Sequence, residues 1–114
     1  PDYYGDERPG DNLYTNSIVA LDAQSGELQW HYQFTPHDLN DWDSNHVPVL
    51  ADMDWQGSLR KVVMVANRNG FFYVLDRVSG EFLLGKPFTG TSWAREIGSD
   101  GRPIVLNDGS KGCV

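Results

Sequence analysis

The stretch SIVALDAQSGELQW, residues 17–30, recurs as FFYVLDRVSGEFLL at residues 71–84. The shared core is Asp-x-x-Ser-Gly, and its two copies start 54 residues apart, at Asp22 and Asp76. This core favours a tight turn, because Asp and Ser bond nearby backbone amides and Gly adopts positive φ. The identical pairs are Leu21/Leu75, Asp22/Asp76, Ser25/Ser79, Gly26/Gly80 and Glu27/Glu81. A repeat of about 50 residues that holds several strands is typical of a β-propeller blade.

Patterns typical of β-strands fill the chain around and between these two turns, and no helix is predicted. We expect a complete four-stranded antiparallel blade over residues 47–87 and the end of a preceding blade over 1–37. The strands that we expect are 16–22, 27–34, 47–53, 60–67, 71–77 and 81–87, with turns at 54–58 and 68–70. Residues 88–114 are expected to form an irregular segment between blades, with 102–106 as a possible strand. Two unrelated hairpins that share a common turn are the alternative to a repeat.

Composition limits the class of protein. The 114 residues are 39% hydrophobic and 22% charged, which is typical of a globular chain. The net charge of −7 argues against nucleic acid or an anionic membrane surface as a partner. No apolar run approaches the ~20 residues of a membrane span. The chain opens on Pro1 and stops just after its single cysteine, Cys113, so we expect a fragment of a longer protein.

An acidic loop, DLNDWDSNHVPV at residues 38–49, crowds Asp38, Asp41 and Asp43 in front of a predicted strand. Alternate connections of an up-and-down meander emerge at the same end, so this loop should share one end with the turn around Arg68. The Ser-Gly turns should lie at the other end. Arg68 would then supply a cation for the carboxylates, and an acidic loop beside an arginine is a candidate site. A solvated surface loop is the alternative.

These residues resemble a known family. The stretch ALDAQSGELQW (20–30) resembles the tryptophan-docking motif of eight-bladed quinoprotein dehydrogenases, from which the second copy departs at Val74 and Leu84. Three further stretches resemble the methanol/ethanol dehydrogenase branch, which uses pyrroloquinoline quinone (PQQ): RPGDNLYTNSIVALD (8–22), FTPHDLNDWD (34–43) and ANRNGFFYVLDR (66–77).

The resemblance implies about one and a half blades of a partial eight-bladed all-β propeller. It also implies a periplasmic PQQ-dependent alcohol dehydrogenase that oxidises primary alcohols to aldehydes by hydride transfer to PQQ and passes electrons to a cytochrome c type acceptor. The fragment alone is expected to be inactive, because isolated repeats lack the neighbours that bury their faces.

Site residues follow from the same resemblance. Asp41 matches the family's general base, and Arg68 matches the residue that contacts the quinone oxygens. Asp43 matches a position that is Asp mainly in lanthanide-dependent members, so Asp41 and Asp43 are candidate ligands of a calcium or lanthanide ion. In an extended chain the two carboxylates would project to one side. The family's metal-binding Glu and Asn have no counterpart in this chain.

Cys113 reads from the sequence alone as a free thiol or as half of a disulfide. The resemblance implies a disulfide with a residue outside this chain, which fits an oxidising periplasm.

Two rival functions fit these residues less well. A non-catalytic quinoprotein-like propeller, acting as a scaffold or binding protein, would need neither Asp41 nor Arg68. A glycosidase is disfavoured, because carboxylates two residues apart lie too close to flank a scissile bond. His31, His37 and His46 are expected to have ordinary polar roles. Trp42 is expected either to line a substrate funnel or to pack.

Overall fold

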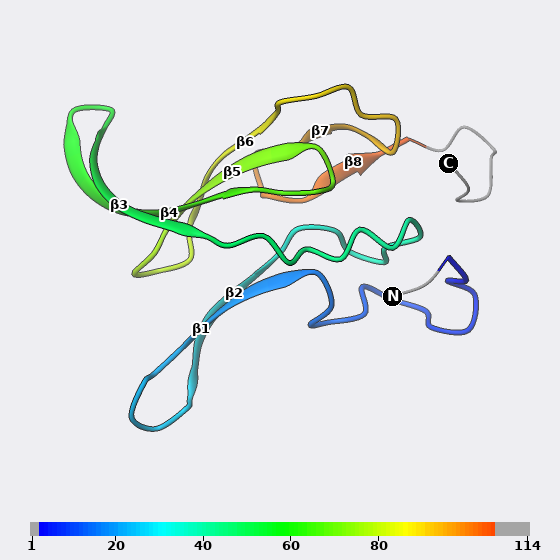
Figure 1. The fold of residues 1–114 in the computed structure, drawn as a ribbon, viewed down its shortest axis with the longest axis horizontal. Helices are drawn as coiled ribbons and strands as arrows, with labels where there is room; N and C mark the ends of the chain where they lie inside the picture. Colours follow the sequence, from blue (N-terminus) through cyan, green and yellow to red (C-terminus); the bar gives the residue numbers. More distant parts are fainter. Residues whose placement is uncertain (1–2, 107–114) are drawn as a thin grey trace.

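The computed structural model describes residues 3–106, and these residues form strands and loops without a helix (Figure 1). The prediction of an all-β fold is confirmed. No helix that could cross a membrane occurs within residues 3–106. The strands are β1 (Ser17–Leu21), β2 (Leu28–Gln33), β3 (Val49–Trp55), β4 (Ser58–Ala66), β5 (Phe71–Asp76), β6 (Phe82–Pro87), β7 (Ala94–Ile97) and β8 (Pro103–Val105).

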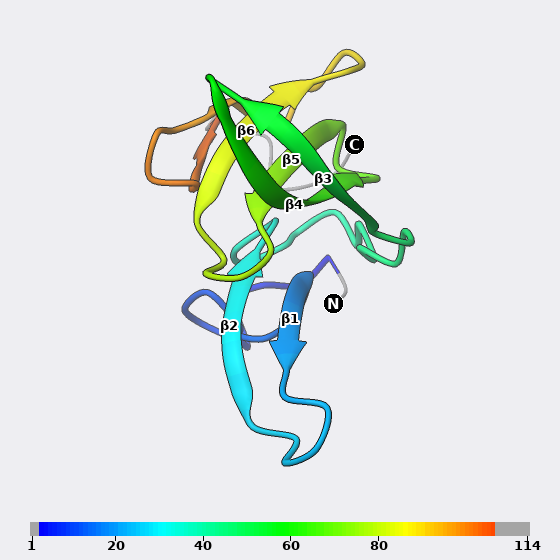
Figure 2. The same ribbon diagram turned by 90° about the vertical axis from the view of Figure 1, so that its left-hand side faces the viewer.

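The strands form three antiparallel sheets in chain order. The largest is a four-stranded meander in which β3, β4, β5 and β6 follow one another as neighbours, and β1–β2 and β7–β8 are hairpins. Figure 2 shows the β1–β2 hairpin below the four-stranded sheet, with the β5–β6 turn reaching toward β2.

The repeated sequence forms the same turn twice. Asp22 Oδ1 accepts hydrogen bonds from the backbone N–H groups of Gln24 (2.9 Å) and Ser25 (2.8 Å). Asp76 Oδ1 accepts them in the same way from Val78 (2.9 Å) and Ser79 (3.0 Å). Each turn ends on a glycine at positive φ, +75° at Gly26 and +80° at Gly80. The turn chemistry predicted from the sequence is therefore present in both copies.

Trp30 docks the first hairpin onto the second turn. Its indole Nε1 donates a hydrogen bond to the backbone oxygen of Arg77 at 3.0 Å. Its ring lies so close to Gly80 that a Cβ built there would stand 2.7 Å from Trp30 Cδ2. A tryptophan of one repeat thus packs on the glycine of the next, which gives Trp30 the packing role expected from its place in the motif.

The core lies between β2 and the large sheet and continues to β7. Its fully or almost fully buried members are Phe34, Val65, Phe71, Tyr73, Ala94 and Ile97. Aromatic rings carry much of the contact: the ring centroids of Phe34 and Tyr73 are 4.8 Å apart, and Tyr32 stacks on Phe82 at 5.8 Å. Burial raises the pKa of the Tyr32 and Tyr73 hydroxyls, so both stay protonated at any ordinary pH.

Two details differ from the sequence predictions. The β3–β4 turn needs only Gln56 and Gly57, both at positive φ (53° and 87°), because two such residues match the twist of the flanking strands. Within the stretch expected to be irregular, β7 pairs with β8, whereas only 102–106 was expected as a strand. β7 reads AREI and is short, so its period-2 pattern is weak. Cys113 lies outside the described residues.

Candidate functional site

The acidic loop and the β4–β5 turn lie at one end of the molecule, and both Ser-Gly turns lie at the other (Figure 1). The loop precedes β3, whereas the turn joins the next two strands. Each strand of a meander reverses direction, so every second connection returns to the same end. The strand order therefore brings the loop of Asp41 and Asp43 to the turn of Arg68.

Asp43 and Arg68 are the candidate site residues that the structure brings into contact. Asp43 Oδ2 lies 3.9 Å from Arg68 Nη1, and the two side chains are 52% and 58% exposed. A pair this open to water is worth little to stability, at most about 1 kcal/mol. Its significance is one of placement: a carboxylate and a guanidinium face solvent together. The sequence prediction that Arg68 neighbours the acidic loop is confirmed for Asp43.

The loop itself is not extended. Asp41 and Asp43 have φ of 53° and 47°, in the left-handed region that Asp tolerates better than most residues. Asp41 is half-buried and Asp43 is exposed. The argument that alternate residues of an extended chain project to one side therefore does not apply here, and that premise was wrong.

Asp38 is the reason for this shape. Its side chain is fully buried (0% exposed), and its Oδ1 accepts a hydrogen bond from the N–H of Asn40 at 2.8 Å. Its Oδ2 accepts from the N–H of Trp42 (2.8 Å) and from Asn16 Nδ2 (2.7 Å). These bonds wind the chain around one carboxylate and hold the residues on both sides of Asp41. The third aspartate of the cluster is thus structural, a role that the sequence analysis did not assign.

The turn that carries Arg68 is equally well fixed. Asn69 is buried, and its Nδ2 donates to Thr35 Oγ1 (3.0 Å) and to the Tyr73 hydroxyl (2.8 Å). The indole Nε1 of Trp93 donates to the backbone oxygen of Asn69 at 2.7 Å. Arg68 therefore projects to solvent from a rigid base. Sequence reasoning found no role for Trp93, since an indole N–H donor to a distant backbone oxygen leaves no sequence pattern.

Trp42 packs rather than standing free. Its ring centroid lies 6.3 Å from that of Trp93 in a tilted arrangement. Its Nε1 is buried and has no hydrogen-bond partner among the described residues. Of the two roles left open for Trp42, this contact favours packing.

The donors present fit part of a hard-cation site. Within residues 3–106 no group of three His, Cys, Asp or Glu side chains could hold a metal ion by itself. Asp41 and Asp43 offer carboxylate oxygens, which calcium and lanthanide ions prefer, but such ions take about six to eight oxygen ligands. The loop could therefore hold such an ion only together with ligands from elsewhere. Arg68 adds a fixed cationic donor suited to carbonyl or carboxylate oxygens.

Of the three histidines expected to have ordinary polar roles, His37 makes a polar contact, whereas His31 makes a ring contact. His37 Nδ1 pairs with the backbone oxygen of Gly10 at 2.8 Å. The ring of His31 meets Tyr14 edge-on at 5.0 Å between centroids, and His46 is exposed.

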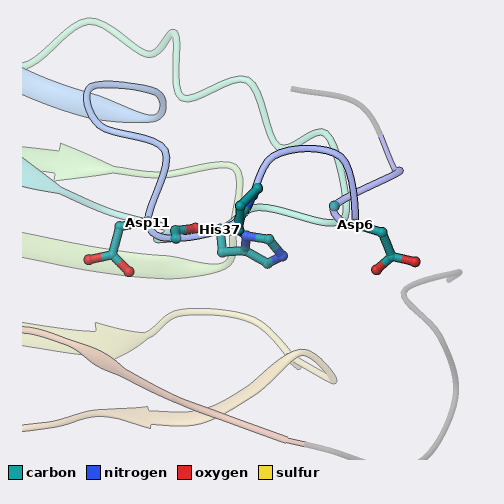
Figure 3. A pocket seen from close by; sticks show the side chains of 6 residues that line it. Asp6, Asp11 and His37 are labelled. Carbon is teal, nitrogen blue, oxygen red and sulfur yellow. Dashed lines mark hydrogen bonds between the residues drawn. The ribbon is translucent and has the colours of Figure 1, made fainter.

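A separate hollow lies near the N-terminal segment (Figure 3). Gly5, Asp6, Pro9, Gly10, Asp11 and His37 line it, and none of the candidate site residues is among them. Asp11 makes a double hydrogen bond with Arg102 at 2.9 and 3.0 Å, which lowers the pKa of the Asp11 carboxyl. These contacts tie the N-terminal segment to the β7–β8 hairpin.

An all-β chain with a repeated docking turn and an acidic loop opposite an arginine defines a propeller with a candidate site at one end. Comparison with known families gives the class its name. Residues 1–86 match the family model described as the glucose/ethanol/alcohol dehydrogenase β-propeller domain of the PQQ proteins. The chain belongs to this family, and its fold is part of the PQQ β-propeller. The resemblance inferred from the sequence motifs is confirmed.

Individual relatives that match this chain are described as alcohol dehydrogenases. The chain is 48% identical over 105 residues to the quinohemoprotein alcohol dehydrogenase of Comamonas testosteroni, covering 90% of this chain and 15% of that protein. It is 47% identical over 107 residues to the quinoprotein alcohol dehydrogenase PedH of Pseudomonas putida, covering 91% and 18%. The chain thus spans less than a fifth of the length of these relatives.

Solved structures of alcohol dehydrogenases share the fold of this chain. The crystal structure of the Comamonas testosteroni enzyme superposes with a TM-score of 0.86 at 45% identity, over 90% of this chain and 15% of that one. A europium-containing methanol dehydrogenase superposes with a TM-score of 0.88 at 33% identity, over 92% and 19%.

Proposed function

We propose that this chain is a segment of a PQQ-dependent alcohol dehydrogenase that oxidises primary alcohols to aldehydes. The observation that carries the proposal is the contact between Asp43 and Arg68 at one end of a PQQ-family propeller. The family match alone would also suit a non-catalytic propeller. Such a protein would have no need of an exposed carboxylate and guanidinium facing each other beside a rigidly held Asp41.

Asp41 is the proposed general base. Bound PQQ would supply the hydride acceptor, and a bound cation would polarise its reactive carbonyl. Asp41 would take the proton of the alcohol hydroxyl, a step for which a positioned base is typically worth ~10²–10⁴-fold in rate. The hydrogen bonds from the N–H groups of Asn40 and Trp42 to Asp38 hold the chain on both sides of Asp41, which supports a fixed position for this carboxylate.

Arg68 is the proposed contact to the quinone oxygens. Its guanidinium keeps its charge at any ordinary pH and presents planar donors, so it would hold and polarise an oxygen that gains negative charge. Support comes from its exposure, from the buried Asn69 that anchors its turn, and from its distance to Asp43. In this arrangement Arg68 orients the cofactor and Asp41 handles the proton.

Asp43, with Asp41, is the proposed contribution of this chain to a calcium or lanthanide site. A trivalent ion gains more from an additional carboxylate than a divalent one, by charge and by coordination number. One structural relative is described as a europium-containing methanol dehydrogenase, which supports a lanthanide in this branch. The remaining ligands would come from other parts of the protein.

The proposal also covers the electron acceptor and the cellular compartment. One relative, from Thauera butanivorans, is described as a 1-butanol dehydrogenase (cytochrome c), with 46% identity over 101 residues. A cytochrome c type acceptor and a periplasmic location are therefore part of the proposal. A disulfide at Cys113 to a residue outside the chain would fit that compartment.

The proposal is tested by adding PQQ and either calcium or lanthanum to the full-length apoprotein. We expect PQQ to remain bound through dialysis and ethanol or 1-butanol to be oxidised with an artificial electron acceptor. A folded protein that neither retains PQQ nor oxidises any short primary alcohol with either ion would instead fit a non-catalytic propeller.

A further inference from the structure

The acidic loop and the Arg68 turn are joined by a second contact, beside the ion pair. Ser44, which follows Asp43, donates its hydroxyl to Oδ1 of Asn67, which precedes Arg68, at 3.2 Å. The sequence neighbours of the two charged residues are thus hydrogen-bonded to each other. This contact is part-buried, whereas the ion pair is open to solvent.

Asn67 is a rigid end of this contact. Only 1% of Asn67 is exposed. Its backbone N–H donates to the backbone oxygen of Phe71 at 2.9 Å, and its backbone oxygen accepts from the N–H of Gly70 at 3.0 Å. Its Oδ1 also accepts the N–H of Asn69 at 3.0 Å, which fixes the orientation of the amide because that position requires an acceptor. Its Nδ2 is buried without a partner among the described residues. Burying an amide nitrogen without a partner is costly. The hydrogen bonds from Ser44 and Asn69 both go to the Oδ1 of this side chain, so the oxygen is the atom that holds it in place.

Ser44 is anchored on the other side. Its N–H donates to Asn16 Oδ1 at 3.0 Å, and Asn16 Nδ2 donates to the buried Asp38 carboxylate at 2.7 Å. A continuous polar chain therefore runs from Asp38 through Asn16 and Ser44 to Asn67. It crosses from the loop that holds Asp41 and Asp43 to the turn that holds Arg68.

The two contacts differ in how firmly they hold the loop to the turn. The Asp43–Arg68 pair is long, and both of its partners are more than half exposed, so solvent screens it. The Ser44–Asn67 bond is part-buried and ends on an almost fully buried amide, where an unmade hydrogen bond is costly. The less exposed of the two contacts between the loop and the turn is therefore the one between Ser44 and Asn67.

We propose that Ser44 and Asn67 form a positioning pair that fixes the acidic loop against the Arg68 turn. The inference rests on the proposed function, because it assigns the pair an effect on how Asp41 and Arg68 act together. Neither residue is assigned a contact with substrate or cofactor. Their effect passes through the position of the two loops.

The test uses the full-length holoenzyme with Ser44→Ala, Ser44→Thr and Asn67→Ala. Ser44→Ala should lower kcat about threefold to tenfold, the loss expected of one hydrogen bond, with little change in the KM for the alcohol. Titration of the apoprotein with PQQ should show binding weakened by a similar factor. Ser44→Thr keeps the hydroxyl and should restore both. Ser25→Ala is the matched control, because it removes a hydroxyl bonded to the Asp22 carboxylate at the opposite end.

Coupling separates positioning from a general loss of stability. In the Asn67→Ala background, Ser44→Ala should have no further effect on kcat or PQQ affinity, because its partner is already absent. Wild-type kcat and PQQ affinity in Ser44→Ala, or effects that simply multiply in the double variant, would overturn the pairing. Asp41→Asn measured alongside keeps the outcomes distinct: if it too remained fully active, the proposed function would fail rather than the pairing alone.

Discussion

Asp43 Oδ2 lies 3.9 Å from Arg68 Nη1, although one residue precedes β3 and the other follows β4. The strand order produces this contact: β3 runs away from the site end, β4 returns to it, and the β4–β5 turn closes beside the loop where β3 began. The carboxylate and the guanidinium thus meet because two consecutive antiparallel strands pair with a fixed register. Both side chains are more than half exposed.

Replacing Asp43 tests its proposed role at a metal ion. In the full-length apoenzyme, lanthanum should activate the wild type better than calcium, and Asp43→Ala should lose that advantage. The reason is that a trivalent ion depends more on an added carboxylate. Activity after reconstitution with each ion is the measurement. Asp54→Ala serves as control, because Asp54 accepts a hydrogen bond from the N–H of Gly57 in the β3–β4 hairpin, at the far end. Equal activation of wild type and Asp43→Ala by both ions would leave Asp43 as loop structure.

Replacing Arg68 tests the proposed quinone contact. Arg68→Ala should weaken PQQ retention and lower kcat, by about 10²-fold if Arg68 stabilises the developing charge as an oxyanion donor does. Arg68→Lys should recover part of the loss, since it keeps the charge without the planar fork. Bound PQQ after dialysis and kcat at saturating cofactor are measured together. Arg95→Ala removes another exposed arginine and should change neither. Full PQQ retention in Arg68→Ala would contradict the assignment.

The docking of Trp30 on Gly80 gives a stability prediction with a control inside the repeat. Gly26→Ala introduces a Cβ at φ +75° into open space, so only backbone strain is expected, about 1–2 kcal/mol. Gly80→Ala introduces the same strain at φ +80° and also drives a Cβ to 2.7 Å from the Trp30 ring. Overpacking of this kind should add roughly 1–3 kcal/mol. Equal losses in the free energy of unfolding of the two full-length variants would mean that the docking contact is not maintained.

The Asp76 turn should give a pH-dependent contribution to stability. Hydrogen bonds from the backbone N–H of Ser79 and Val78, together with nearby Arg60, hold the pKa of the Asp76 carboxyl below its usual value. A depressed folded-state pKa adds stability that is complete above about pH 4 and is lost as the pH falls through the folded pKa. Asp76→Ala should therefore unfold at lower denaturant concentration than wild type at pH 7. The difference should shrink below pH 4, and a gap that widened in acid would contradict this sign.

Much of the fold could be predicted because it rests on local chemistry. Asp22 and Asp76 each cap a turn that ends on glycine, and both turns formed as the repeat indicated. The alternation of strands then placed Arg68 at the end that holds the acidic loop. Strand β7 was not predicted, because four residues are too few to show a clear alternation of apolar and polar side chains. Its buried residues, Ala94 and Ile97, pack into a core that is formed mainly by other strands.

The interior of the site was less predictable, since its determinants are distant in sequence. The sequence does not distinguish the three neighbouring aspartates, yet Asp38 is fully buried and Asp43 is exposed. The partner that helps to bury Asp38 is Asn16, which lies across the β1–β2 hairpin. Asp41 and Asp43 adopt the left-handed region, which no periodicity argument could anticipate.

The most direct test of the account is the alcohol oxidation rate of Asp41→Asn in the full-length holoenzyme. Asparagine keeps the shape of the side chain and removes the base, so we predict that PQQ stays bound and that kcat falls by about 10²–10⁴-fold. Asp52→Asn is the control, because Asp52 pairs with Arg77 within the large sheet and has no proposed role in catalysis. Wild-type turnover in Asp41→Asn with PQQ bound would contradict the assignment of Asp41 as the base.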